Sequence, residues 1–250
     1  MKKMLFTLLA ACTLSLVGCL ESTQEVTIKE DGSGTVSYTS DMSALVGMIK
    51  QMGGAEDIKE SEQALDSTIS MDQIADSIPN LTDNERALMK KSEMRINMDM
   101  NKEKLLLKMH FPFNNVSAIE DCNRLSGIMV GEALKGQPGM EGMSEDGGSP
   151  QFSSFEEYFK TVYSNGRIEK TLIKEKYEKV GEDEFFKSMK ESEGLGLSMK
   201  ANYIINLPRP ASKAEGKGLT LSEDKKKITI AVSMEDFFDE PAKFEYVIEY

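Results

Sequence analysis

The chain has 250 residues, 40% of them hydrophobic, and a formal net charge of −12 at pH 7. This length suits one well-packed domain or two small ones. The acidic balance repels phosphate backbones, so we expect no nucleic-acid partner. Trp is absent and Met occurs 17 times, which indicates an adaptable apolar interior.

Residues 1–18 have the pattern of a secretory signal peptide. Lys2 and Lys3 precede an apolar run that is shorter than the roughly 20 residues of a membrane-spanning helix. The run ends in Leu16-Val17-Gly18-Cys19, which resembles the lipobox of bacterial lipoproteins. The resemblance implies cleavage before Cys19 and its modification by diacylglycerol and a further acyl chain of the palmitate type. Two or three acyl chains form a stable lipid anchor in a membrane.

The alternative is a secreted protein with a chance cysteine near its cleavage site. If the lipobox is used, the mature chain keeps 28 basic and 42 acidic residues, a net charge of −14. Cys12 is then removed and Cys19 is acylated, so Cys122 remains and no intramolecular disulfide is expected. Leu20 follows the cysteine where the lipoprotein family uses Asp for inner-membrane retention. The resemblance therefore implies the outer membrane of a Gram-negative envelope.

We expect residues 19–24 to be a lipidated tether and residues 25–250 to be a single α+β domain. Glycines between alternating runs predict a hairpin of residues 24–30 with 35–39, and a second hairpin joins 93–100 to 105–111. Alternation recurs in 167–173, 197–207, 228–232 and 244–250. These patterns predict an antiparallel sheet with one buried face, covered by helices.

Helical periodicity appears between these runs. It predicts amphipathic helices over residues 41–52, 117–129, 155–163 and 182–191, the last with acids first and lysines later. Thr82 with Glu85 has the spacing of a capping box. Residues 136–151 are rich in Gly, Met and Ser and are expected to form a mobile loop.

Several of these segments together resemble the LppM-type domain of bacterial envelope lipoproteins. They are the strand pair around Asp31-Gly32-Ser33-Gly34, the helix after Asp41-Met42-Ser43, and the run from Tyr203 to Pro208 with the strand at 227–232. The resemblance implies an envelope-tethered module that binds lipid or glycolipid, and it brings no catalytic residues. The chain differs from that family in ending on a strand at Tyr250.

No common nucleophile, zinc, nucleotide or calcium signature occurs, so we predict no catalytic residue, metal or cofactor. His110 is expected to face solvent on a strand, and Cys122 to be an inert core thiol, in preference to a catalytic dyad. Ser222-Glu223-Asp224-Lys225 fits the Ser-x-x-Lys spacing but has the composition of a charged turn.

Three weaker patterns leave alternatives open. Met140 and Met143 could offer thioethers to Cu(I), although such carriers usually hold several such pairs. The aromatic stripe from Phe155 to Tyr163 favours core packing over a ligand platform. Acids within 182–184 or 236–240 could act on a glycan, with solvated surface as the default.

These observations favour a non-enzymatic, membrane-anchored lipoprotein that binds an apolar ligand, a lipid or glycolipid, or a partner protein. The reason is the Met-lined sheet face with the aromatic helix, because thioethers adapt to varied apolar shapes. The alternative is a structural or assembly module of the envelope. A carboxylate-dependent hydrolase is the third hypothesis and requires two acids that converge in a cleft.

Overall fold

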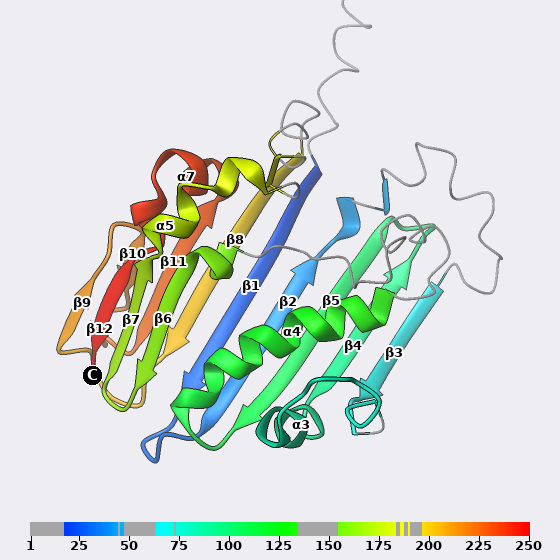
Figure 1. Ribbon diagram of the computed structural model, residues 1–250, viewed down its shortest axis with the longest axis horizontal. Helices are drawn as coiled ribbons and strands as arrows, with labels where there is room; N and C mark the ends of the chain where they lie inside the picture. The colour runs from blue at the N-terminus through cyan, green and yellow to red at the C-terminus, as the bar shows by residue number, and fades with distance from the viewer. Residues whose placement is uncertain are drawn as a thin grey trace, which may run out of the picture.

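The computed structural model describes residues 18–44, 46, 47, 64–72, 74–134, 155–183, 186, 187, 190 and 197–250. Two β-sheets and a few helices make up this part of the chain (Figure 1). The predicted mobile loop at 136–151 and most of the predicted helix at 41–52 lie outside the described residues.

The larger sheet has eight strands. In spatial order they are β10 (Leu219–Leu221), β11 (Lys227–Ser233), β8 (Leu197–Asn206), β1 (Gly18–Ile28), β2 (Gly34–Asp41), β5 (Lys104–Phe113), β4 (Glu93–Asp99) and β3 (Ala64–Ser70). Strand β1 runs parallel to β8, whereas every other pair in this sheet is antiparallel. The N-terminal strand therefore joins the first half of the chain to its last third.

The smaller sheet has four strands, in the order β6 (Phe159–Ser164), β7 (Arg167–Leu172), β12 (Tyr246–Glu249) and β9 (Lys213–Glu215). The α-helices with described bounds are α3 (Asp83–Met89), α4 (Ile119–Leu134), α5 (Lys174–Tyr177) and α7 (Met234–Asp239). Short 3-10 helices are η2 (Val116–Ala118), η4 (Phe155–Tyr158), η5 (Val180–Glu182) and η6 (Pro241–Phe244). The predicted α+β class, with a largely antiparallel sheet, is confirmed.

One face of the larger sheet is buried, as the alternation predicted. Along β5 the side chains of Leu107, Met109 and Phe111 are buried, whereas those of Lys108 and His110 are exposed. Helix α4 lies across this buried face (Figure 1) and turns an apolar stripe toward it. The stripe consists of Ile119, Cys122, Leu125 and Met129, each 0% exposed.

The smaller sheet shares the covering of this face, which the sequence did not predict. Lys170 of β7 lies with its Nζ 4.3 Å from the ring centroid of Tyr203 of β8. Aromatic rings fill the space around this contact; they include Phe155, Tyr158, Phe159, Phe186, Phe237 and Phe244. The buried apolar residues of both sheets form one continuous cluster.

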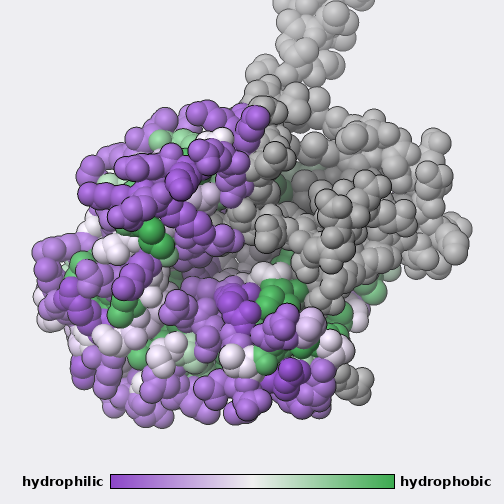
Figure 2. Space-filling view, in the orientation of Figure 1, coloured by the Kyte–Doolittle hydropathy of each residue, from purple (hydrophilic) through white to green (hydrophobic). Residues whose placement is uncertain are grey.

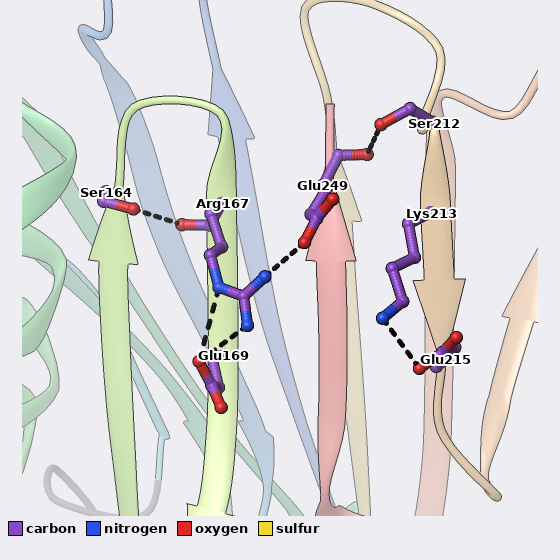
Figure 3. A network of polar contacts seen from close by, with 7 residues as sticks. All are labelled: Ser164, Arg167, Glu169, Ser212, Lys213, Glu215 and Glu249. Atoms are coloured by element: carbon purple, nitrogen blue, oxygen red, sulfur yellow. Dashed lines mark hydrogen bonds and ion pairs between the residues drawn. The ribbon is translucent and has the colours of Figure 1, made fainter.

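The outer face of the smaller sheet is polar. Arg167 of β7 bonds to Glu169 at 3.0 Å and to Glu249 of β12, and Lys213 of β9 lies 3.1 Å from Glu215 (Figure 3). On the face shown in Figure 2, hydrophilic residues cover most of the described part, and hydrophobic ones show in small patches. Among the described helices, none is long and apolar enough to cross a bilayer.

Strand β1 starts earlier than we predicted. Residues 20–24, expected to be a polar tether, pair with β8 and, from Glu21, with β2. The polar side chains suit this position because they bond across the exposed face. On this face the Asn202 side chain donates to the Glu21 carboxylate at 2.8 Å.

The predicted aromatic helix over 155–163 is also wrong. Phe155–Tyr158 is a 3-10 turn, and Phe159–Ser164 is strand β6, paired with β7. Thr161, Val162 and Tyr163 favour a strand, because branched and aromatic side chains suit a pleated surface. Strand β3 (Ala64–Ser70) lies in a segment for which the sequence analysis predicted no strand. The capping box of α3 is confirmed, since the Thr82 amide donates to Glu85 Oε2 at 2.8 Å and Glu85 N to Thr82 Oγ1 at 3.3 Å.

An ion pair between a buried lysine and a partly buried glutamate lies between the two sheets. The side chain of Lys170 is 1% exposed, and its Nζ lies 2.6 Å from Oε1 of Glu156. The rings of Tyr203 and Phe159 also face this ammonium group, with centroids at 4.3 and 5.0 Å. Burial raises the pKa of Tyr203 well above its ordinary value, and the neighbouring Glu156 carboxylate raises it further. The Glu156 carboxylate, 2.6 Å from Lys170 Nζ, offsets the cost of burying this side chain in an aromatic core.

Lys170→Met should lower the free energy of unfolding by about 3 kcal/mol, because it leaves Glu156 without its cation. The Glu156→Gln/Lys170→Met double variant should recover most of this loss. Lys176→Met is the matched control, since Lys176 pairs with Glu157 at 3.0 Å on the surface and its loss should cost less than about 1 kcal/mol. Urea denaturation of the variants measures all of these values. Equal losses for Lys170→Met and Lys176→Met would contradict a stabilising buried pair.

Gly34→Ala should also destabilise the fold strongly. A Cβ at Gly34 would overlap the Thr27 carbonyl oxygen and lie 2.6 Å from Cζ of Phe113, so β1 or β5 must shift. We expect a loss of about 3 kcal/mol. Gly127→Ala in α4 is the control, because nothing lies within 4 Å of its added Cβ. It should stabilise the helix by about 0.5–1 kcal/mol. Thermal melts of both variants test the contrast.

Candidate functional site

Residues that follow the smaller sheet's second strand pack against helix α7. The segment contains α5, η5 and the helical residues Phe186, Lys187 and Lys190. The Tyr177 hydroxyl at the end of α5 lies 2.7 Å from the Phe237 carbonyl oxygen and 3.1 Å from that of Phe238. This bond ties α5 to α7, which lie close together in Figure 1.

A pocket of about 310 Å³ lies between these segments. It is lined by Val180, Gly181, Phe186, Lys187, Lys190 and Phe238. Phe186 is 1% exposed and stacks on Phe237 with ring centroids 5.0 Å apart, so it is fixed in the core. We call this site the Phe238 pocket.

Both charged residues of the Phe238 pocket are lysines. Lys187 and Lys190 are exposed, and Lys190 Nζ lies 5.0 Å from the ring centroid of Phe238. Long lysine side chains can cover an apolar surface while their ammonium groups stay in water. The site therefore combines an apolar wall with two cations, an arrangement that suits an amphiphile with an anionic group.

Asp183 fixes the position of the segment that enters the pocket. Its carboxylate accepts a hydrogen bond from the Tyr158 hydroxyl at 2.9 Å and from the Phe186 amide at 3.3 Å. Burial and the bond to Asp183 raise the pKa of Tyr158, so this hydroxyl stays protonated as a donor. The Asp183 carboxylate thus links the backbone of Phe186 to the side chain of Tyr158 and holds Phe186 in position.

The ligand surface that we predicted is part of the core instead. Met94, Met109 and Met129 are at most 4% exposed, because α4 packs on the Met-lined face of the sheet. Phe155 and Phe159 are buried as well, so the aromatic stripe packs as core. Sequence reasoning missed Phe238 and the Phe238 pocket. The sequence pattern that could have indicated this pocket was the predicted helix at 182–191, which carries Lys187 and Lys190 in its second half.

The other predicted site residues lie apart from the Phe238 pocket. Cys19 lies in β1, paired with Ser198. His110 is exposed, with Nδ1 3.1 Å from the Ser37 hydroxyl, whereas Cys122 is 0% exposed on the opposite side of the sheet. The two do not form a dyad. Ser222 closes the turn before β11, where its hydroxyl lies 2.6 Å from Asp224, so the charged-turn interpretation is confirmed.

Two of the acids at 236–240 form ion pairs with lysines, whereas the predicted methionine pair cannot be placed. Asp236 caps α7 and bonds to Lys243 at 2.5 Å, and Glu240 pairs with Lys217 at 2.8 Å. Met140 and Met143 lie outside the described residues. No cluster of three potential metal ligands from His, Cys, Asp and Glu occurs among the residues that the structure describes.

Cys122 should resist thiol reagents in the folded protein. Burial, with a contribution from Asp121, raises the pKa of its thiol to about 12, so the reactive thiolate is scarce at pH 8. We expect modification by a maleimide only in denaturant, as measured by mass spectrometry. The unfolded thiol ionises at a lower pH than the folded one. Ionisation of Cys122 therefore lowers the free energy of unfolding as the pH rises toward 12. Rapid labelling at pH 8 without denaturant would contradict the prediction.

No family model matches the chain, and no curated protein matches it. Among solved structures, the folded domain of the LppM protein of Mycobacterium tuberculosis aligns over 92% of this chain and 90% of that one. The two share 6% sequence identity with a TM-score of 0.34, so the chain is only weakly similar to that domain.

Proposed function

We propose that this chain is a non-enzymatic lipoprotein of the Gram-negative cell envelope, held in the outer membrane by a lipid anchor on Cys19. We further propose that it binds the apolar part of a lipid or glycolipid in the Phe238 pocket. The sequence supports the anchor through Leu16-Val17-Gly18-Cys19 and through Leu20 after it.

The observation that carries the ligand proposal is the chemistry of the Phe238 pocket. Its walls come from Val180, Phe186 and Phe238, and its charged groups are Lys187 and Lys190. Small-molecule sites are typically concave, mostly apolar and equipped with a few polar groups that fix orientation. A volume of about 310 Å³ lies at the lower end of the range for such sites, enough for part of an acyl chain or a headgroup.

A second candidate is an interaction module that offers a sheet edge to a partner protein. Strand β3 is the last strand of the larger sheet, and within the described residues it pairs with β4 alone. Leu65 on this strand is 36% exposed. An edge strand of this kind can accept a strand from another chain.

The test is native mass spectrometry of the full protein extracted from envelopes. We expect an acyl mass on the peptide that begins with Cys19, and a further non-covalent mass that organic solvent removes. Lys187→Gln/Lys190→Gln should weaken the non-covalent binding roughly twofold to thirtyfold, because each of the two exposed ion pairs contributes about 0.2–1 kcal/mol. Phe238→Ala should weaken it as well, since it removes one apolar wall.

The matched control is Lys213→Gln/Lys226→Gln, which removes two exposed lysines away from the pocket and should leave ligand occupancy unchanged. A protein with the acyl mass but without any bound ligand would refute the ligand proposal. Recovery of a bound protein instead of a lipid would favour the interaction module.

A further inference from the structure

The distance between the proposed anchor and the sheet is very short. Leu20, the residue after Cys19, already pairs with Met199 of β8, and Glu21 pairs with both Lys200 and Asp41. A chain spans at most about 3.6 Å per residue, so Glu21 lies within roughly 7 Å of the acylated residue. A sheet held this closely cannot move far from the bilayer, and the anchor selects which of its ends faces the membrane.

The strand register identifies the elements at that end. Glu21 of β1, Lys200 of β8 and Ser233 of β11 form one row across three neighbouring strands. Helix α7 begins at the next residue, Met234, and carries Phe238. Figure 1 shows α7 and the start of β1 at the same end of the molecule, whereas the β1–β2 turn and the C-terminus lie at the other end.

We infer that this end of the larger sheet rests on the membrane surface, and that the Phe238 pocket takes a zwitterionic phospholipid with a free ammonium group from the leaflet that holds Cys19. The inference rests on the proposed anchor at Cys19. It adds an orientation of the domain on the bilayer and a headgroup class for the bound lipid.

The charges at this end select the headgroup class. Lys187 and Lys190 lie at the pocket, whereas Glu235 and Asp239 are exposed on α7 on either side of Phe238 in the sequence. A phosphate matches the lysines, and a free ammonium group matches the two carboxylates. The net charge of −14 on the mature chain disfavours a purely anionic lipid surface. Phosphatidylethanolamine carries a phosphate that matches the lysines of the pocket and an ammonium group that matches the exposed carboxylates of α7.

Fluorescence quenching tests the orientation. A dye is attached through Glu235→Cys on α7 or, as a matched control, through Glu30→Cys in the β1–β2 turn. The native Cys122 is buried and does not compete for the dye. The full acylated protein is reconstituted into vesicles of phosphatidylethanolamine and phosphatidylglycerol that contain a lipid with a nitroxide on its headgroup.

We expect strong quenching at position 235 and almost none at position 30. The strand from Glu21 to Ile28 alone separates the two ends by about 23 Å, which exceeds the range of contact quenching. Insertion of ten Gly and Ser residues between Cys19 and Leu20 should reduce the quenching at position 235, because such a linker extends roughly 17 Å. Equal quenching at both positions, or quenching unaffected by the linker, would overturn the orientation.

The headgroup class has a separate measurement. After reconstitution, native mass spectrometry should find phosphatidylethanolamine retained in preference to phosphatidylglycerol, and Lys187→Gln/Lys190→Gln should reduce its retention. Preferential retention of phosphatidylglycerol would overturn the zwitterionic assignment. Absence of an acyl mass on Cys19 would refute the proposed anchor, whereas an acylated protein with no quenching at position 235 would refute this inference alone.

Discussion

The pairing of β1 with β8 is the constraint on which the rest of this structure depends. It joins residues about 180 positions apart, with ten partners in register from Gly18↔Leu197 to Thr27↔Asn206. On one side of β1 the chain adds β2, β5, β4 and β3 through antiparallel pairs, and on the other side β8 adds β11 and β10. Without this pair the larger sheet would be two separate sheets, and β1 and β8 would each be an unpaired edge strand. Unpaired edge strands are prone to association.

The same pairing determines how a lipid anchor would act. A flexible tether would let the domain tumble above the bilayer, because Gly- and Ser-rich linkers behave as random coils. Here the backbone of Leu20 and Glu21 is already fixed by its partners in the sheet. An anchor next to a central strand transfers its position to the whole sheet, so the chemistry of one end of the fold becomes relevant to function.

The contact between the two sheets depends on a different interaction, an ion pair surrounded by aromatic rings. Lys170 bonds to Glu156 inside a set of aromatic rings. A charge in such a setting is tolerated because an opposite charge lies within hydrogen-bonding distance and ring faces add electrostatic attraction. Asn123 joins helix α4 to the larger sheet. Its side-chain oxygen accepts hydrogen bonds from Gln24 of β1 at 2.8 Å and from Tyr38 of β2. Polar groups thus specify how α4 and the smaller sheet lie on a largely apolar surface.

Local patterns in the sequence were sufficient for the α+β class, the two hairpins, helix α4 and the buried faces of β5, β8 and β11. These features repeat with a period of two or of 3.6 residues, and that period depends on backbone geometry alone. The Cys19 motif is equally local and remains a prediction. The β1–β8 pair, the second sheet and the Phe238 pocket could not be predicted in this way. Each depends on residues far apart in the chain, whose proximity only the packed tertiary structure decides.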